Sequence, residues 1–236
     1  MPHRHWLAAI PGHLTKIKLA VLFAGLIPLV ELIQDYQQNT LGFDPLDRIT
    51  RSTGSIALIL LMVVLAITPL RYLLTRTMIL MGAAHGKRPS DWNWVIKLRR
   101  MLGLLAFFYA TLHLGIYFWL DQGGNIADAL RDNADRPYIA IGSAAFLLLV
   151  PLAMTANDYS IRQLGKKWRF LHRLVYPIMI LSIIHYWMLT KLGVSDPIPY
   201  ALITAILLGW RFWFALKAIH NKIINYSEEI PERESS

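Results

Sequence analysis

Histidine side chains are the residues of this sequence best suited to bind a metal ion. The chain contains eight histidines and no cysteine. Without cysteine, disulfides, thiolate-bound zinc, cysteine-held iron–sulfur clusters and c-type haem attachment are all excluded. Three histidines, His113, His172 and His185, fall within segments apolar and long enough to cross a bilayer.

An ionisable side chain inside a membrane span is energetically costly, and it is by default a candidate functional group. The alternative for such a histidine is a structural hydrogen bond to a neighbouring helix. The other five histidines lie in polar terminal or loop segments, where solvated side chains are common, and we assign them no role. These five are His3, His5, His13, His85 and His220.

Two of the three candidates are predicted to lie at one depth. At 1.5 Å per residue, His113 lies about 18 Å from the start of its span at Met101, and His185 about 20 Å from a start near Leu171. Neutral imidazoles on facing helices at one level suit bis-histidine axial coordination of haem iron, and no carboxylate accompanies them as a hard cation would require. The sequence therefore predicts a b-type haem held by His113 and His185.

His172 lies near the opposite edge of its span. A partner in the preceding histidine-bearing span would have to lie about fourteen residues before His113, where the sequence has Arg99. On an ideal helix, going from His172 to His185 rotates the side chain by about 220° beyond three full turns, so the two do not share a face. Pro177 between them can kink the helix. We predict that His172 is a further haem ligand whose partner is unidentified.

The elements that position these histidines are apolar helices. Hydrophobic residues make up 55% of the 236 residues and charged residues only 17%, which argues against a water-soluble globule. We expect an all-α integral membrane protein, a six-transmembrane-helix bundle forming a single membrane domain over 1–236, with a polar cytoplasmic tail at 220–236. The expected helices are approximately 17–34, 52–72, 101–120, 137–157, 171–190 and 197–216.

Basic residues predict the orientation of this bundle. Alternate non-membrane segments carry 19 of the 24 Lys and Arg residues and the others carry 5, so both termini are expected to be cytoplasmic. Topology thus accounts for the net charge of +9, and we expect no nucleic-acid partner. The loops are too short for a soluble domain and lack Gly-rich nucleotide-binding motifs. Arg99, Arg100, Lys166 and Lys167 either anchor the bundle or meet haem propionates or a flavin phosphate.

Several motifs resemble those of a known family, the MsrQ haem-binding membrane subunits of the bacterial periplasmic methionine sulfoxide reductase system. The resemblance extends from about Leu14 to Leu216. Its motifs are Ser52-Thr-Gly54, Ile67-Thr-Pro-Leu70, Thr111-Leu-His113-Leu, Arg136-Pro-Tyr138, Leu164-Gly-Lys-Lys-Trp168 with the following His172 and Tyr176, and Ile184-His185-Tyr186.

This resemblance implies a ferric reductase-like fold in the bacterial inner membrane, with haem b and FMN as cofactors. It places the haem ligands on His113, His172 and His185. It also implies that electrons pass from the quinone pool or a flavin reductase to MsrP, a periplasmic molybdenum-containing reductase of methionine sulfoxide. The loop at 75–93 is longer than the family pattern, so we assign no flavin contacts there.

Two other functions are compatible with membrane-embedded histidines. A proton-coupled transporter would use His113 and His185 as a relay, but transporters commonly contain internal repeats, which we do not find. A ferric or other metal reductase would share the fold but recruit an NADPH-flavin module. The outer loops at 34–51, 121–136 and 191–196 contain no catalytic constellation. We therefore expect an electron-transfer subunit rather than the catalytic reductase itself.

Overall fold

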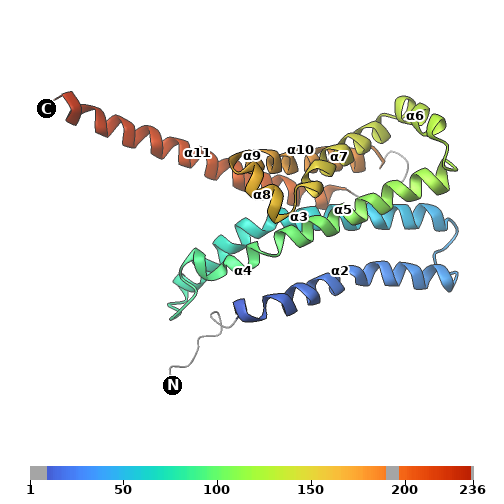
Figure 1. Cartoon of the computed structure of the whole chain (residues 1–236), viewed down its shortest axis with the longest axis horizontal. Helices are drawn as coiled ribbons and strands as arrows, with labels where there is room; N and C mark the ends of the chain where they lie inside the picture. Colours follow the sequence, from blue (N-terminus) through green and yellow to red (C-terminus); the bar gives the residue numbers. More distant parts are fainter. Residues whose placement is uncertain (1–9, 190–196, 235–236) are drawn as a thin grey trace, which may run out of the picture.

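The computed structural model describes residues 10–189 and 197–234, and this part of the chain is helical with no β-strand. The long helices run side by side along one axis, and α11 projects beyond the others toward the carboxyl terminus (Figure 1). The elements are η1 (Ile10–His13), α2 (Leu14–Gln37), α3 (Pro45–Leu80), η2 (Pro89–Trp92), α4 (Asn93–Ile96), α5 (Arg99–Ile116), η3 (Tyr117–Asp121), α6 (Ile126–Asp135), α7 (Pro137–Met154), α8 (Asp158–Leu164), α9 (Lys166–Leu171), η4 (His172–Leu174), α10 (Val175–Leu189) and α11 (Ile198–Glu234).

Five of these segments are long and apolar enough to cross a membrane. They are α2, α3, the segment Pro89–Asp121, α7, and residues Ile198–Asn221 of α11. The sixth helix, α10, has 15 described residues and packs along α7 inside the bundle. The predicted all-α, six-helix membrane fold is therefore confirmed, and the protein is a multi-pass membrane protein.

Helix α3 is much longer than the span expected at 52–72. Its amino terminus is fixed by Asp44, whose carboxylate accepts a hydrogen bond from the Asp47 backbone N–H at 3.0 Å, and by Pro45 in the first turn. Arg51 then pairs with Asp47 one turn away. Charged residues end the apolar part of a span, but they do not end the helix, which explains the difference.

The span expected as one helix at 171–190 is interrupted. Helix α9 ends at Leu171, the 3₁₀ turn η4 follows, and α10 begins at Val175. Pro177 therefore lies in the first turn of α10, where its missing N–H breaks no helical hydrogen bond. The interruption precedes the proline and separates His172 from the helix that carries His185.

Two tightly packed helix pairs, α3 with α5 and α7 with α10, build the core. Its most buried side chains, each at most 1% exposed, are Leu65, Ala106, Tyr109, Ile178 and Met179. Helices α2 and α11 cover this core and turn large apolar side chains such as Phe23, Ile206 and Phe212 outward. An apolar outer surface is what lipid contact requires, because lipid tails cannot solvate polar groups.

The segment expected as a loop at 121–136 contains a short helix. Helix α6 is capped by Asn125, whose side-chain oxygen accepts a hydrogen bond from the Ala127 N–H at 2.9 Å. It lies at one end of the bundle, and α4 lies at the other (Figure 1). We call these the α6 end and the α4 end.

Candidate functional site

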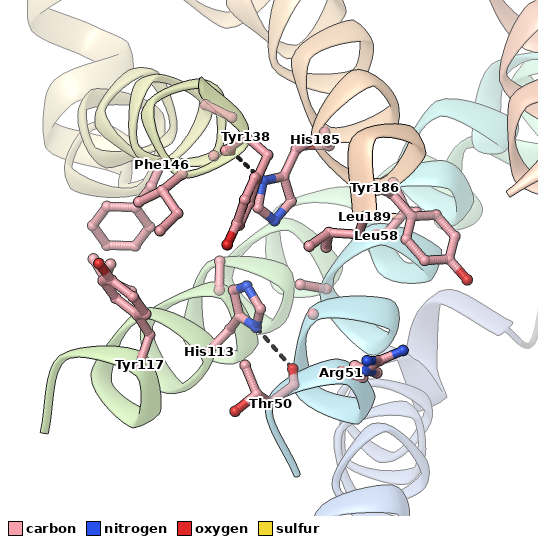
Figure 2. Close-up of a pocket in the computed structure, with 18 of the residues that line it drawn as sticks. Thr50, Arg51, Leu58, His113, Tyr117, Tyr138, Phe146, His185, Tyr186 and Leu189 are labelled. Carbon is pink, nitrogen blue, oxygen red and sulfur yellow. Dashed lines mark hydrogen bonds between the residues drawn. The ribbon is translucent and has the colours of Figure 1, made fainter. Parts of the chain in front are cut away.

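Two of the three predicted histidines meet near the α6 end. His113 is in the last turn of α5, and His185 lies four residues before Leu189, the last described residue of α10. Their ring centroids are 6.1 Å apart and their planes are nearly perpendicular, at 83°. The two rings point toward each other from opposite sides of a cavity (Figure 2).

Each of these imidazoles is held by the backbone of a neighbouring helix. Nδ1 of His113 lies 2.8 Å from the Thr50 carbonyl oxygen on α3, and Nδ1 of His185 lies 2.6 Å from the Tyr138 carbonyl oxygen on α7 (Figure 2). A carbonyl oxygen can only accept, so both Nδ1 atoms carry the proton and donate it. In each neutral ring the Nε2 lone pair is therefore left free to bind a metal, with the ring orientation fixed from outside.

A glycine lies beside each histidine ring. A Cβ atom added at Gly142 would lie 2.8 Å from Nδ1 of His185, and one added at Gly54 would lie 3.0 Å from Nδ1 of His113. Each glycine lies four residues after the residue whose carbonyl accepts the hydrogen bond of the imidazole, so it occupies the next turn of the same helix face. The two helix pairs thus repeat one arrangement, in which a carbonyl orients the imidazole and a glycine makes room for it.

The cavity between these rings has a volume of about 450 Å³ and is lined by α3, α5, α7 and α10. Its wall is mainly apolar and includes Leu58, Phe146, Ile178 and Leu189. Two metal–imidazole bonds of about 2 Å, plus half a ring on each side, put the centroids roughly 6 Å apart, which agrees with the observed spacing.

The donor set suits haem better than a bare ion. Among the described residues, no group of three His, Cys, Asp or Glu side chains is placed to hold a metal. An ion bound between the two imidazoles would lack further side-chain ligands, whereas haem supplies its own four equatorial nitrogens. The residues present therefore fit a bis-histidine haem.

Polar groups line the mouth of the cavity and fasten α6 to it. The Asp132 side chain, 12% exposed, accepts a hydrogen bond from the Tyr117 hydroxyl at 2.7 Å and forms an ion pair with Arg136 Nε at 2.8 Å. Arg136 also donates to the Tyr138 hydroxyl at 3.3 Å. The Tyr138 hydroxyl, followed by the charge of Asp132, raises the pKa of Arg136, so this guanidinium remains charged at the cavity mouth.

His172 lies outside this cavity. Its ring stacks on Trp168, with centroids 3.8 Å apart, and its Nδ1 lies 3.1 Å from the Trp168 carbonyl of the preceding turn. Arg99, at the position where a partner was sought, donates instead to Thr68. The role of His172 as a haem ligand stays a prediction.

Some site residues lacked an assigned role at the sequence level. Gly54 and the Arg136-Pro-Tyr138 motif stand out in the sequence only as points of family resemblance, and no sequence motif includes Gly142 or Phe146. A small residue in the middle of an apolar span indicates close helix packing, and this signal would have drawn attention to Gly142. Two tyrosines of these helices differ in placement: Tyr186 lines the cavity, whereas the Tyr109 hydroxyl donates to the Gly25 carbonyl on α2 at 2.8 Å.

Most of the chain is similar to known proteins of one membrane family. Residues 53–183 match the family model described as ferric reductase like transmembrane component. This region contains all of α5 and α7 and most of α3 and α10, and it ends two residues before His185.

Several similar proteins are named protein-methionine-sulfoxide reductase heme-binding subunit MsrQ. The protein from Azospira oryzae is 41% identical over 203 residues, covering 85% of this chain and 80% of its own. The one from Herminiimonas arsenicoxydans is 42% identical over 219 residues, covering 91% and 93%. The one from Xanthomonas campestris is 44% identical over 180 residues, covering 76% and 75%.

Proposed function

Because this chain belongs to the MsrQ family of ferric reductase-like transmembrane proteins, we propose that it is a b-type haem electron-transfer subunit of a methionine sulfoxide reductase system. In this proposal it passes electrons across the bacterial inner membrane to a periplasmic molybdenum-containing reductase of the MsrP type. That partner then repairs oxidised periplasmic proteins.

The observation that carries the proposal is the pair of opposed imidazoles, each with its Nδ1 proton donated to a backbone carbonyl. His113 and His185 would hold the haem iron through Nε2, and the haem would supply one-electron transfer at this site. The apolar wall would exclude water from the ligands. Arg51 and Arg136 at the mouth supply positive charge for propionate carboxylates.

The direction of transfer follows from the expected orientation. The basic loops predict that the α4 end faces the cytoplasm and the α6 end the periplasm, with both termini cytoplasmic. The His113/His185 site lies near the α6 end, so electrons would leave there to a docked acceptor. The donor would reach the α4 end or the membrane interior, either as a quinone or through a flavin reductase, with FMN as the second cofactor.

A reoxidation experiment tests the proposal. The purified protein should give a reduced-minus-oxidised spectrum of low-spin b-type haem. Its pre-reduced haem should be reoxidised by an MsrP-type reductase when methionine sulfoxide is present, and should remain reduced when that substrate is omitted. A His185→Ala variant should not support the transfer, and neither should the wild type if the partner's molybdenum cofactor has been removed.

A metal reductase is the second candidate, because the matching family model is named for ferric reductases. In that case pre-reduced haem would pass electrons to ferric chelates as fast as to the MsrP-type reductase. Rapid reoxidation by chelates, together with indifference to the reductase and its substrate, would replace our proposal with this alternative. A purified protein without haem would instead support the transporter hypothesis.

A further inference from the structure

Helix α6 turns one row of side chains toward the bundle. Its partly buried residues are Ala129, Asp132 and Asn133, at spacings typical of one helix face. Asp132 is the charged member of this row, and its side chain is only 12% exposed, whereas Asp128 and Asp135 of the same helix are exposed. Because a carboxylate withdrawn from water is costly unless donors satisfy it, its partners indicate what Asp132 holds in place.

Both oxygen atoms of the Asp132 carboxylate are engaged. Oδ2 accepts hydrogen bonds from the Tyr117 hydroxyl at 2.7 Å and from Gln122 Nε2 at 3.3 Å. Oδ1 forms the ion pair with Arg136 Nε at 2.8 Å. Tyr117 and Gln122 precede α6 in the chain and Arg136 follows it, so segments on both sides of α6 meet on this one carboxylate.

The two principal partners of this carboxylate adjoin the two halves of the histidine site. Tyr117 comes four residues, about one helical turn, after His113. Arg136 comes two residues before Tyr138, whose carbonyl oxygen lies 2.6 Å from Nδ1 of His185. Arg136 Nη1 also donates to the Tyr138 hydroxyl at 3.3 Å. Tyr117 lies on the His113 side of the cavity and Tyr138 beside His185 (Figure 2).

The Asp132 contacts lie at one edge of the gap between the two helix pairs. At the level of the rings, a cavity of about 450 Å³ separates α3 and α5 from α7 and α10. Deeper in the bundle, Phe107 of α5 stacks on Phe146 of α7 with centroids 5.7 Å apart, and Phe107 comes six residues, about 9 Å, before His113. Where side chains do not fill a space, contacts at its edges fix the distance between its walls.

We propose that Asp132 is a positioning residue that fixes the spacing and relative angle of the His113 and His185 rings. It ties the end of the helix that carries His113 to the start of the helix that orients His185, with Tyr117 and Arg136 as the two attachment points. A residue that only fastened α6 to the surface would leave the geometry of the rings unchanged. The expected effect on haem rests on the proposed function, whereas the effect on helix spacing does not.

The ring geometry is tested by electron paramagnetic resonance of the ferric protein. The g-values of low-spin haem with two axial imidazoles depend on the angle between the ring planes, which is 83° here. We expect Asp132→Ala to shift the g-values and to weaken haem binding about tenfold, as for loss of an outer partner of a ligand. Asp135→Ala removes an exposed carboxylate of the same helix and is the matched control, which should keep both properties of the wild type.

The route through the two attachment points is tested by combining substitutions. Tyr117→Phe removes the hydroxyl and Arg136→Gln removes the charge, and each alone should shift the g-values less than Asp132→Ala. In the Tyr117→Phe and Arg136→Gln double variant, Asp132→Ala should add little, because its principal partners are already gone. Asp132→Glu keeps the charge and should recover part of the lost haem affinity. An undiminished effect of Asp132→Ala in the double variant would overturn the assigned route.

Helix spacing is measured without reliance on haem. The chain has no cysteine, so spin labels can be placed at cysteines introduced for the exposed Leu120 of η3 and Leu147 of α7. Pulsed electron–electron distance measurements on full-length protein in nanodiscs should give a broader distribution in Asp132→Ala than in the wild type or Asp135→Ala.

The outcomes separate the two proposals. A wild type without haem would refute the proposed function, and the label distances would still decide the role of Asp132. If Asp132→Ala does not fold, Asp132→Asn keeps the side-chain volume and an acceptor for the Tyr117 hydroxyl but loses the ion pair, and it should give smaller changes of the same kind. Wild-type label distances and, in the haem-bound protein, wild-type g-values in the folded Asp132 variants would overturn the proposal.

Discussion

His113 and His185 differ from His172 in what holds the ring. The first two donate to carbonyls on a different helix, α3 or α7, whereas His172 bonds to the carbonyl of Trp168, one turn earlier in its own segment. A bond to another helix fixes the ring relative to the rest of the bundle, and a bond within one segment fixes it only relative to that segment. The comparison indicates that tertiary contacts prepare the first two rings to share one ligand.

The largest effect is expected from removing a ring of the pair. His113→Ala or His185→Ala should abolish the low-spin b-type spectrum or convert it to five-coordinate high spin, because one axial nitrogen is lost. Haem affinity should fall by more than the roughly 10–100-fold typical of losing an outer hydrogen-bond partner of a ligand. Absorption spectra with haem quantitation measure both changes.

The exposed His220 supplies the control for this experiment, and His220→Ala should leave the spectrum unchanged. Full low-spin haem in both single variants of the pair would refute the proposed coordination.

The glycines beside the rings should give the next largest effect. Gly142→Ala would place a Cβ within 2.8 Å of the His185 ring, and Gly54→Ala would place one within 3.0 Å of the His113 ring. The imidazole must then shift from its carbonyl, and we expect a loss of haem affinity on the order of tenfold, larger for Gly142 than for Gly54. Haem titration of the apoprotein measures it.

Gly103 on α5 provides a matched substitution. A Cβ there would meet nothing within 4 Å, so Gly103→Ala should retain haem and slightly stabilise the helix. If Gly142→Ala binds haem as tightly as Gly103→Ala, the close approach of this glycine has no role in positioning the ring.

His172→Ala should have a smaller effect on the haem spectrum than either change in the pair. If His172 is a ligand, a distinct haem species should disappear while the low-spin signal of the His113/His185 site persists, since the two sites use different helix contacts. Low-temperature spectra and haem-to-protein ratios separate the species. Complete loss of haem in His172→Ala would mean that the two regions are not independent.

The smallest effect is expected from the ion pair that joins α5 to α8, the helix that precedes the segment carrying His172. Arg100 bonds to Asp158 at the start of α8, at 2.5 Å, and both side chains are well exposed. The hydrogen bond and charge of Arg100 hold the pKa of Asp158 below its usual value. A carboxyl pKa that is lower in the folded protein means that the stabilisation is present at neutral pH and is lost as the pH falls through that lowered pKa.

Thermal unfolding of wild type and Asp158→Asn should therefore differ slightly at neutral pH and converge in acid. The difference should also shrink with added salt, because exposed ion pairs are screened. Asp128→Asn, in the outer helix α6, controls for the loss of a surface charge. A difference that grows in acid would contradict the assigned role of this pair.

The sequence predicted much of the fold because membrane spans have a simple physical signature. Apolar stretches of about 20 residues located the helices, and their spacing placed His113 and His185 at a common depth. The ends of the helices were less predictable. Capping by Asp44 extends α3 beyond its apolar part, and capping by Asn125 forms a helix in a segment too polar to be recognised as a span.

The interruption at η4 was also not evident from the sequence. Pro177 indicated a possible kink, but the proline falls in the first turn of α10, and the 3₁₀ turn lies before it. The angle between His172 and His185 therefore cannot be read from an ideal helix, because the two residues belong to different helical segments.

The sequence by itself determined which side chains could act, since the chain has no cysteine and three of its eight histidines are in apolar segments. The tertiary structure decided which of them act together. Orientation of His113 depends on Thr50 and Gly54, and orientation of His185 on Tyr138 and Gly142, residues brought near by packing of helices distant in the chain. Helical periodicity describes neighbours along one helix, but hydrogen bonds and close approach between helices depend on packing, which periodicity does not encode.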